Sequence, residues 1–150
     1  MNIGIFEIAL KEFVEVTTSD LMFLEQGKKV PARRPIRVFS GFLPPNTAED
    51  EIPAIAIRFN KAEDSIDARV LYFDFYFAIF NRDSEGYKEL TLLIERVINN
   101  ITEKKYIGEY LSYSGAGEFE IEDEQPYPFW IGSARLKFEA PKPDYIPSYY

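Results

Sequence analysis

The segment 66–80 constrains the fold most, because it contains an uninterrupted alternation of large apolar residues, "VLYFDFYFAIF" over residues 70–80. Side chains of a strand point alternately to its two sides, so this spacing predicts one long β-strand. One face is wholly apolar and the other is mixed. A chain of 150 residues seldom covers both faces of so long a strand, so we expect one face to meet a second subunit. The apolar face consists of Leu71, Phe73, Phe75, Phe77 and Ile79, and the mixed face of Val70, Tyr72, Asp74, Tyr76, Ala78 and Phe80.

Two segments have the three-and-four spacing of amphipathic helices. The first covers about residues 5–16 and is expected to end at Thr17 and Thr18. The second follows "NRDSEGY", where Asp83 or Ser84 is expected to cap the helix. The apolar stripe of the first is Ile5, Ile8, Ala9, Phe13 and Val16, and that of the second is Tyr87, Leu90, Ile94, Val97, Ile98 and Ile101.

Other segments read as shorter strands. The residues 36–42, 52–59, 106–113 and 119–123 have strand patterns, with Ala54 and Ala56 small enough to let a helix lie close to the sheet. The segment 20–35 is interpreted as a surface connection and "SGAGE" (114–118) as a break. In the closing strand, about residues 130–140, the period of two places Trp130 on the core side.

The order of these elements predicts an α+β domain, with a mainly antiparallel β-sheet and two amphipathic helices packed on it. No repeat or domain boundary is evident, so we expect a single domain over residues 1–150. The final segment, about 141–150, contains three prolines and three tyrosines and is expected to be an extended C-terminal arm.

Composition excludes several classes of site. The chain contains no histidine and no cysteine, which removes the usual zinc ligands, thiolate nucleophiles and disulfides. No phosphate loop or calcium loop is present, so no catalytic, cofactor-binding or metal-binding residue is assigned. The net charge of −8 argues against sequence-specific nucleic acid binding, and the basic segment 27–35 is interpreted as a solvated loop. Neither a secretory signal nor a membrane span is expected.

Asp74 stands out because a carboxylate within "YFDFYF" is costly to bury without a partner. It could pair with Arg58 or Arg69, or mark a functional site. The favoured interpretation is that it points outward with Tyr72 and Tyr76 on the mixed face. The other acidic groupings are interpreted as solvated loops. They are Asp64 with Asp67, Glu118 with Glu120, and residues 122–124.

Three stretches together resemble the tail terminator, or tail completion, proteins of long-tailed bacteriophages and prophages. They are "VFSGFLPPNTAEDEIPAIAIRF" (38–59), "NRDSEGYKELTLLIERVINNI" (81–101) and "EDEQPYPFWIGSARLKFEAP" (122–141). The resemblance extends over about residues 36–141 in order and spacing. Its most specific parts are "EQPYPFWIG" and the aromatic-led helix after "DSEGY". The basic segment 27–35 and the tyrosine-ended arm have no counterpart in it.

The resemblance implies a structural virion protein and not an enzyme. Such proteins form a ring, typically a hexamer, at the head-proximal end of the tail tube, stop tube polymerisation and join tail to head. The expected partners are other copies of the chain, the tail tube protein and a head completion or neck protein. The chain would be made in the bacterial host cytoplasm and reside in the virion tail. The candidate subunit-interface residues are Tyr72, Asp74, Tyr76, Phe80, Tyr145 and Tyr149.

Two alternatives remain. The first is another neck or tail-associated subunit, either a head completion protein or a tube component, because a fold does not determine a role. The second is a small carboxylate-based hydrolase or a carbohydrate-binding module. A concave pocket with converging acids would favour it.

Overall fold

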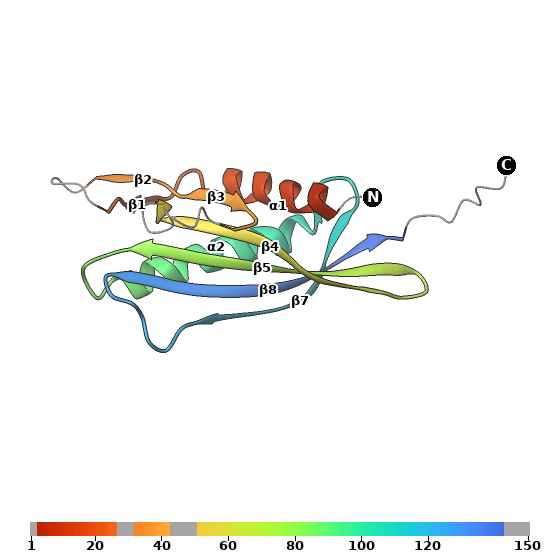
Figure 1. The fold of residues 1–150 in the computed structure, drawn as a ribbon. Coiled ribbons are helices and arrows are strands. Elements are labelled where there is room, and N and C mark those ends of the chain that lie inside the picture. The colour runs from red at the N-terminus through yellow and green to blue at the C-terminus, as the bar shows by residue number, and fades with distance from the viewer. Residues whose placement is uncertain (1–2, 27–31, 43–50, 143–150) are drawn as a thin grey trace.

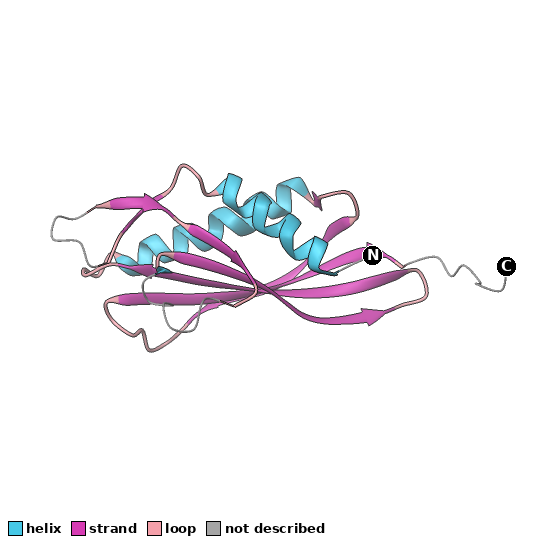
Figure 2. Ribbon diagram, turned by 45° about the horizontal axis from the view of Figure 1, so that its top comes forward, coloured by secondary structure: helices cyan, strands magenta, loops and turns pink. Residues whose placement is uncertain are grey.

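Two helices and a six-stranded sheet make up most of the fold, in a computed structural model that describes residues 3–26, 32–42 and 51–142 (Figure 1). Both helices lie on the same side of the sheet (Figure 2). The α+β class with a mostly antiparallel sheet is therefore as expected. The helices are α1 (Ile3–Thr17) and α2 (Gly86–Lys104), and the strands are β1 (Met22–Leu24), β2 (Arg33–Pro35), β3 (Arg37–Ser40), β4 (Ala54–Asp64), β5 (Ala68–Phe80), β6 (Tyr106–Ile107), β7 (Leu111–Ile121) and β8 (Phe129–Pro141).

The sheet has the strand order β3-β4-β5-β8-β7-β6. The long strand predicted over 66–80 is β5, which lies in the middle and pairs antiparallel with β4 and with β8. Of the described strand pairs in this sheet, β3 with β4 is the parallel one. β4 continues beyond the predicted strand 52–59 to Asp64, so the β4–β5 hairpin projects beyond the helices (Figure 1).

The apolar face of β5 forms the core. Its five alternating residues from Leu71 to Ile79 are at most 1% exposed and pack in one cluster with side chains from both helices. The α2 stripe is confirmed from Leu90 to Ile101, with Leu93 buried as well. Tyr87 departs from the predicted stripe because it is 52% exposed. The expected cap at Asp83 or Ser84 is wrong, because the N-cap is Glu85, whose side chain makes no capping hydrogen bond. The Asp83 carboxylate accepts from the Glu85 backbone N–H in the turn before the helix.

The predicted extent of α1 is confirmed, but its predicted stripe is only partly right, since Ala9 and Phe13 pack partly buried against the core and its other members do not. The buried residues are Phe6, Leu10 and Val14, whereas Ile5, Ile8 and Val16 are exposed. Apolar residues occur on more than one side of this helix, so spacing alone leaves two stripes available. Packing against β3 and β4 selects the series that contains Leu10.

Two further expectations are corrected. The segment 20–35 contains a hairpin in which β1 pairs with β2, and Phe23 is buried in the core. Ala54 and Ala56 do not face the helices, because Ile55 and Ile57 occupy that side of β4. Residues 43–50, which belong to the first stretch of the resemblance, lie outside the described part.

The strands expected at 106–113 and 119–123 are also divided differently. Tyr106 and Ile107 form β6, and a turn then leads into β7. The break expected at 114–118 lies within β7, where the pairing with β8 shifts register between Tyr113 and Gly117. Gly115 has a φ of 85°, which suits glycine at this irregularity.

Trp130 is partly buried against the core, as predicted. Its indole Nε1–H donates a hydrogen bond of 3.0 Å to the carbonyl oxygen of Asn81. The ring lies against Gly86 at the start of α2, where an added Cβ would come within 2.1 Å of Nε1. A side chain at position 86 is therefore excluded unless Trp130 moves.

Candidate functional site

No helix of the described residues covers the side of the sheet opposite α1 and α2, and we call this side the open face (Figure 2). It carries the mixed residues of β5 together with alternate residues of β4, β8 and β7. Its central members are Arg58, Tyr72, Asp74, Tyr76, Glu118, Glu120, Ser133, Arg135 and Lys137.

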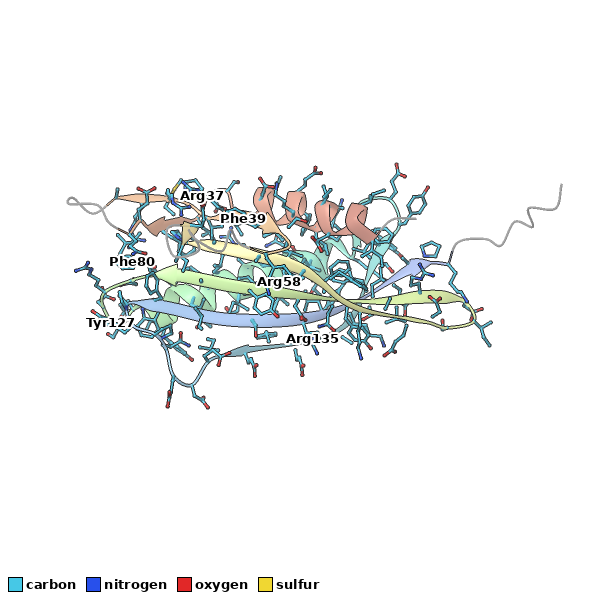
Figure 3. All side chains as sticks on the ribbon, viewed as in Figure 1. Arg37, Phe39, Arg58, Phe80, Tyr127 and Arg135 are labelled. Atoms are coloured by element: carbon cyan, nitrogen blue, oxygen red, sulfur yellow. The ribbon has the colours of Figure 1, made fainter. Side chains whose placement is uncertain are left out.

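Four charged residues of alternating sign lie across the middle of this face. Strand register places Arg58 of β4 opposite Asp74 of β5, Asp74 opposite Arg135 of β8, and Arg135 opposite Glu118 of β7. Arg58 and Arg135 therefore lie on either side of β5 (Figure 3). Opposite charges on directly paired residues stabilise a sheet, so this charged row is favourable as it stands.

Asp74 binds Arg135 through both carboxylate oxygens, with N–O distances of 2.7 and 3.2 Å. The Asn60 amide also donates to Asp74, at 3.0 Å, and the Tyr76 hydroxyl lies 3.4 Å away. Asp74 does share a face with Tyr72 and Tyr76, as expected, but it is only 7% exposed and does not point into solvent. Its partner is neither Arg58 nor Arg69. Arg58 is also directly opposite Asp74, but its guanidinium packs on aromatic rings, and Arg69 pairs with Asp64.

The pair has an electrostatic consequence for Arg135. The pKa of its guanidinium is raised above the ordinary value, first by the hydrogen bond to Asp74 and then by the charge of that carboxylate. Arg135 therefore stays cationic, and its side chain remains 45% exposed beside a carboxylate that is 11% exposed. In this pair the carboxylate of Asp74 is buried, whereas the guanidinium of Arg135 remains accessible to solvent.

Arg58 is held by aromatic rings. Its guanidinium carbon lies 4.0 Å from the ring centroid of Phe42 and 4.3 Å from that of Tyr76. Its Nε–H also donates to the carbonyl oxygen of Gly41. These two cation–π contacts stabilise the charge of Arg58 at a partly exposed site, where no carboxylate is needed as a partner.

A shallow depression of about 460 Å³ opens on the same face. Its lining includes Asp74 and Arg135 from the charged row, Tyr76, and three glutamates of β7 and the following turn: Glu118, Glu120 and Glu122. Within the described ranges no three carboxylates come close enough together to hold a metal ion. The depression is therefore an acidic surface in which one acid is already neutralised.

The candidate interface residues are distributed unevenly. Tyr76 is 38% exposed in the centre of the open face, and Tyr72 is partly buried beside the Lys61 ammonium, which lies 4.7 Å from its ring centroid. Phe80 is 6% exposed and packs against Phe129, with ring centroids 5.8 Å apart. Tyr145 and Tyr149, in the proposed arm, lie outside the described residues.

Two charged groupings named from sequence have local partners. Asp64 forms an ion pair with Arg69 across the β4–β5 hairpin. In the basic segment, Arg33 pairs with Glu89 of α2 and Arg34 pairs with Glu25. The neighbours of the charged residues on the open face do not follow from local sequence, because only the strand register shows that Glu118 lies beside Arg135.

Comparison with known proteins leaves the resemblance to tail terminators as a prediction: no protein-family model matches the chain, and no curated protein sequence matches it either. Neither α1 nor α2 is long and apolar enough to cross a membrane.

Proposed function

We propose that this chain is a phage tail terminator, a structural protein that forms a ring at the head-proximal end of the tail tube. The ring would end tube polymerisation and join the tail to the head through a head completion or neck protein. This proposal combines the sequence resemblance with one structural observation. The two faces of one sheet differ, since the helices cover only one of them.

The open face supports an assembly role because its groups are suited to binding a protein surface. It is broad, it exposes Tyr76 at its centre, and its charged row places Arg135 within reach of a partner. Tyrosine and arginine are the side chains most enriched at energetically important interface positions. The projecting β4–β5 hairpin adds a second surface that the helices do not cover (Figure 1).

The test is native mass spectrometry of the purified chain, alone and mixed with tail tube protein. The proposal expects a closed oligomer, typically six copies, and a complex of that ring with the tube protein. A chain that stays monomeric over the whole concentration range and does not bind the tube protein would contradict it.

A second test uses micrographs of tails made without the gene. These tails are expected to show uncontrolled length, which distinguishes a terminator from another neck subunit.

The contribution of the open face is tested separately with Tyr76→Glu. This change places a carboxylate at the centre of the face and is expected to abolish the ring. The matched control is Tyr87→Glu on α2, where another exposed tyrosine lies on the helix layer. If both variants form rings as well as the unchanged chain does, the interface lies elsewhere.

The acidic depression favours the alternative of a carbohydrate-binding or hydrolytic site. Against it, Asp74 is bound to Arg135, and Glu118 and Glu120 are alternate residues of one strand instead of groups facing each other across a cleft. A pair of catalytic carboxylates needs to flank the scissile bond. Titration of the chain with oligosaccharides, followed by amide chemical shifts, would favour this alternative if Tyr76 and its neighbours responded.

A further inference from the structure

Among the residues that the structure describes, strand β7 has a free edge along most of its length. On one side it pairs with β8 up to Ile121, while on the other side β6 pairs only with Leu111 and Ser112. No strand in the described part of the chain pairs with the outer side of residues 114–121. Residues 114–120 are all exposed. Such an edge presents backbone N–H and C=O groups that an added strand can bind.

The charge along this edge selects the strand that can be added. Five carboxylates lie on β7 and in the turn that follows it. Arg135 lies opposite one of them, Glu118, and is influenced by its charge, but its guanidinium hydrogen-bonds to Asp74. Two β7 edges would place glutamates against glutamates, and like charges opposite each other destabilise a sheet. A partner strand therefore needs cations. The five carboxylates are Glu118, Glu120, Glu122, Asp123 and Glu124.

The open face supplies room for the side chains of that strand. Glu118 and Glu120 point to the same face as Asp74 and Tyr76 and line the depression of about 460 Å³. Alternate side chains of a strand added to β7 would lie over this face, next to the two glutamates. Lysine or arginine at those positions would reach the glutamates, whereas Asp74 is already occupied by Arg135.

We propose that β7 binds an extended basic segment of another protein by strand addition, with lysine or arginine at every second position over the open face. The backbone of the edge strand supplies affinity, and the glutamates supply the choice of partner. This interaction does not require the ring, so the experiments below test it independently of the proposed function.

The first experiment titrates the isotopically labelled full chain with the peptide acetyl-KTKTKTKTK-amide and follows backbone amide shifts. Binding is expected to shift the amides of residues 114–121 and to weaken in 1 M salt, where the screening length is about 3 Å. The same peptide with glutamate in place of lysine is expected not to bind. Shifts confined to the helices, or no binding of the lysine peptide, would overturn the proposal.

Backbone methylation tests strand addition itself. Two further peptides are N-methylated, one at every lysine and the other at every threonine. Alternate residues of a strand direct their N–H groups to opposite edges, so one peptide is expected to lose at least about tenfold in affinity while the other binds nearly as before. Equal binding of the two methylated peptides would mean that charge alone attracts the peptide, and would overturn the proposal.

Charge reversal on the protein completes the test. The double variant Glu118→Lys with Glu120→Lys is expected to bind the lysine peptide at least about tenfold more weakly. The matched control, Glu95→Lys with Glu103→Lys on α2, changes the net charge equally at exposed positions. Equal weakening in both would overturn the proposal. An oligomer that dissociates only in the first variant would identify a second copy as the occupant and would also overturn it.

Discussion

Phe73 and Asp74 are adjacent on β5 and are both buried, yet their surroundings differ completely. Phe73 is 0% exposed among apolar side chains beneath the helices, with Phe59 and Phe138 as edge-on ring neighbours. Asp74 is 7% exposed on the opposite face, where Arg135 and Asn60 cover it from neighbouring positions in the sheet. On the helix face, a side chain such as Phe73 is buried because a layer of helices covers it. On the open face, Asp74 is buried because side chains of neighbouring strands lie over it.

This difference changes the interpretation of the long strand. A surplus of apolar sheet surface was the reason to expect a second subunit on one face of β5. The apolar face is sealed by α1 and α2 within one chain, and the open face is polar and charged around Tyr76. Contacts of the open face with other proteins are therefore expected to depend on charge and hydrogen bonding, and to be sensitive to salt.

The largest effect is expected from Phe73→Ala. Removing a fully buried aromatic ring leaves a cavity between sheet and helices, which costs about 3–5 kcal/mol of the free energy of unfolding. Urea unfolding followed by circular dichroism measures the loss. The matched change Tyr76→Ala on the open face is expected to cost less than about 1 kcal/mol. Similar losses for the two variants would show that the open face is as tightly packed as the core.

Replacing Asp74 or Arg135 one at a time is expected to lower the stability of the fold by unequal amounts. Arg135→Met leaves a nearly buried carboxylate whose remaining hydrogen bonds come from Asn60 and Tyr76, whereas Asp74→Asn leaves an arginine that water can reach. The urea midpoint should therefore fall further in Arg135→Met, by an amount between those of Phe73→Ala and Tyr76→Ala. A larger fall in Asp74→Asn would contradict the one-sided burial of the pair.

Gly86→Ala tests the fit between α2 and the start of β8. The new methyl group would overlap the Trp130 indole, so the variant is expected to lose about 1–3 kcal/mol despite the helix preference of alanine. Trp130 fluorescence should shift as the ring is displaced. Adding Trp130→Phe is expected to recover part of the loss caused by Gly86→Ala. Strictly additive losses would contradict this contact.

The smallest effect is expected from Asp64→Asn at the exposed β4–β5 hairpin. The hydrogen bond from Arg69 lowers the pKa of Asp64 in the folded chain, so the ionised carboxylate favours folding above its unfolded pKa of about 3.9. This contribution is lost as pH falls through the lower, folded pKa. The variant should be slightly less stable than the unchanged chain at pH 7 and equally stable near pH 2, as measured by thermal unfolding. A difference that grows on acidification would reverse the assigned direction.

Local patterns predicted the parts of the fold that depend on a single period. The alternation of β5 and the stripe of α2 each leave one apolar surface to bury, so their positions and inward faces followed from sequence. The stripe of α1 followed only in part, because Ile5 and Phe6 begin two competing apolar series on the same helix. The short β1–β2 hairpin was missed because a strand of three residues is too short to establish an alternation.

The candidate site was less accessible to sequence reasoning than the fold. Tyr76 and Asp74 could be placed on a shared face, but Arg58, Arg135 and Glu118 come from three other strands far apart in the chain. Their alignment depends on a register that shifts between Phe59 and Lys61 in β4 and again between Tyr113 and Gly117 in β7. A shift of one position would have placed different charges opposite Asp74.

The amino-acid sequence by itself determined which surfaces of β5, α2 and β8 are apolar, because side-chain direction within one element repeats with a known period. Only the tertiary structure decided which side of α1 is buried, which cation neutralises Asp74, and which edge of the sheet stays free. Those outcomes depend on how elements distant in sequence pack and pair, and many arrangements satisfy the same local pattern until the whole sheet and both helices are assembled.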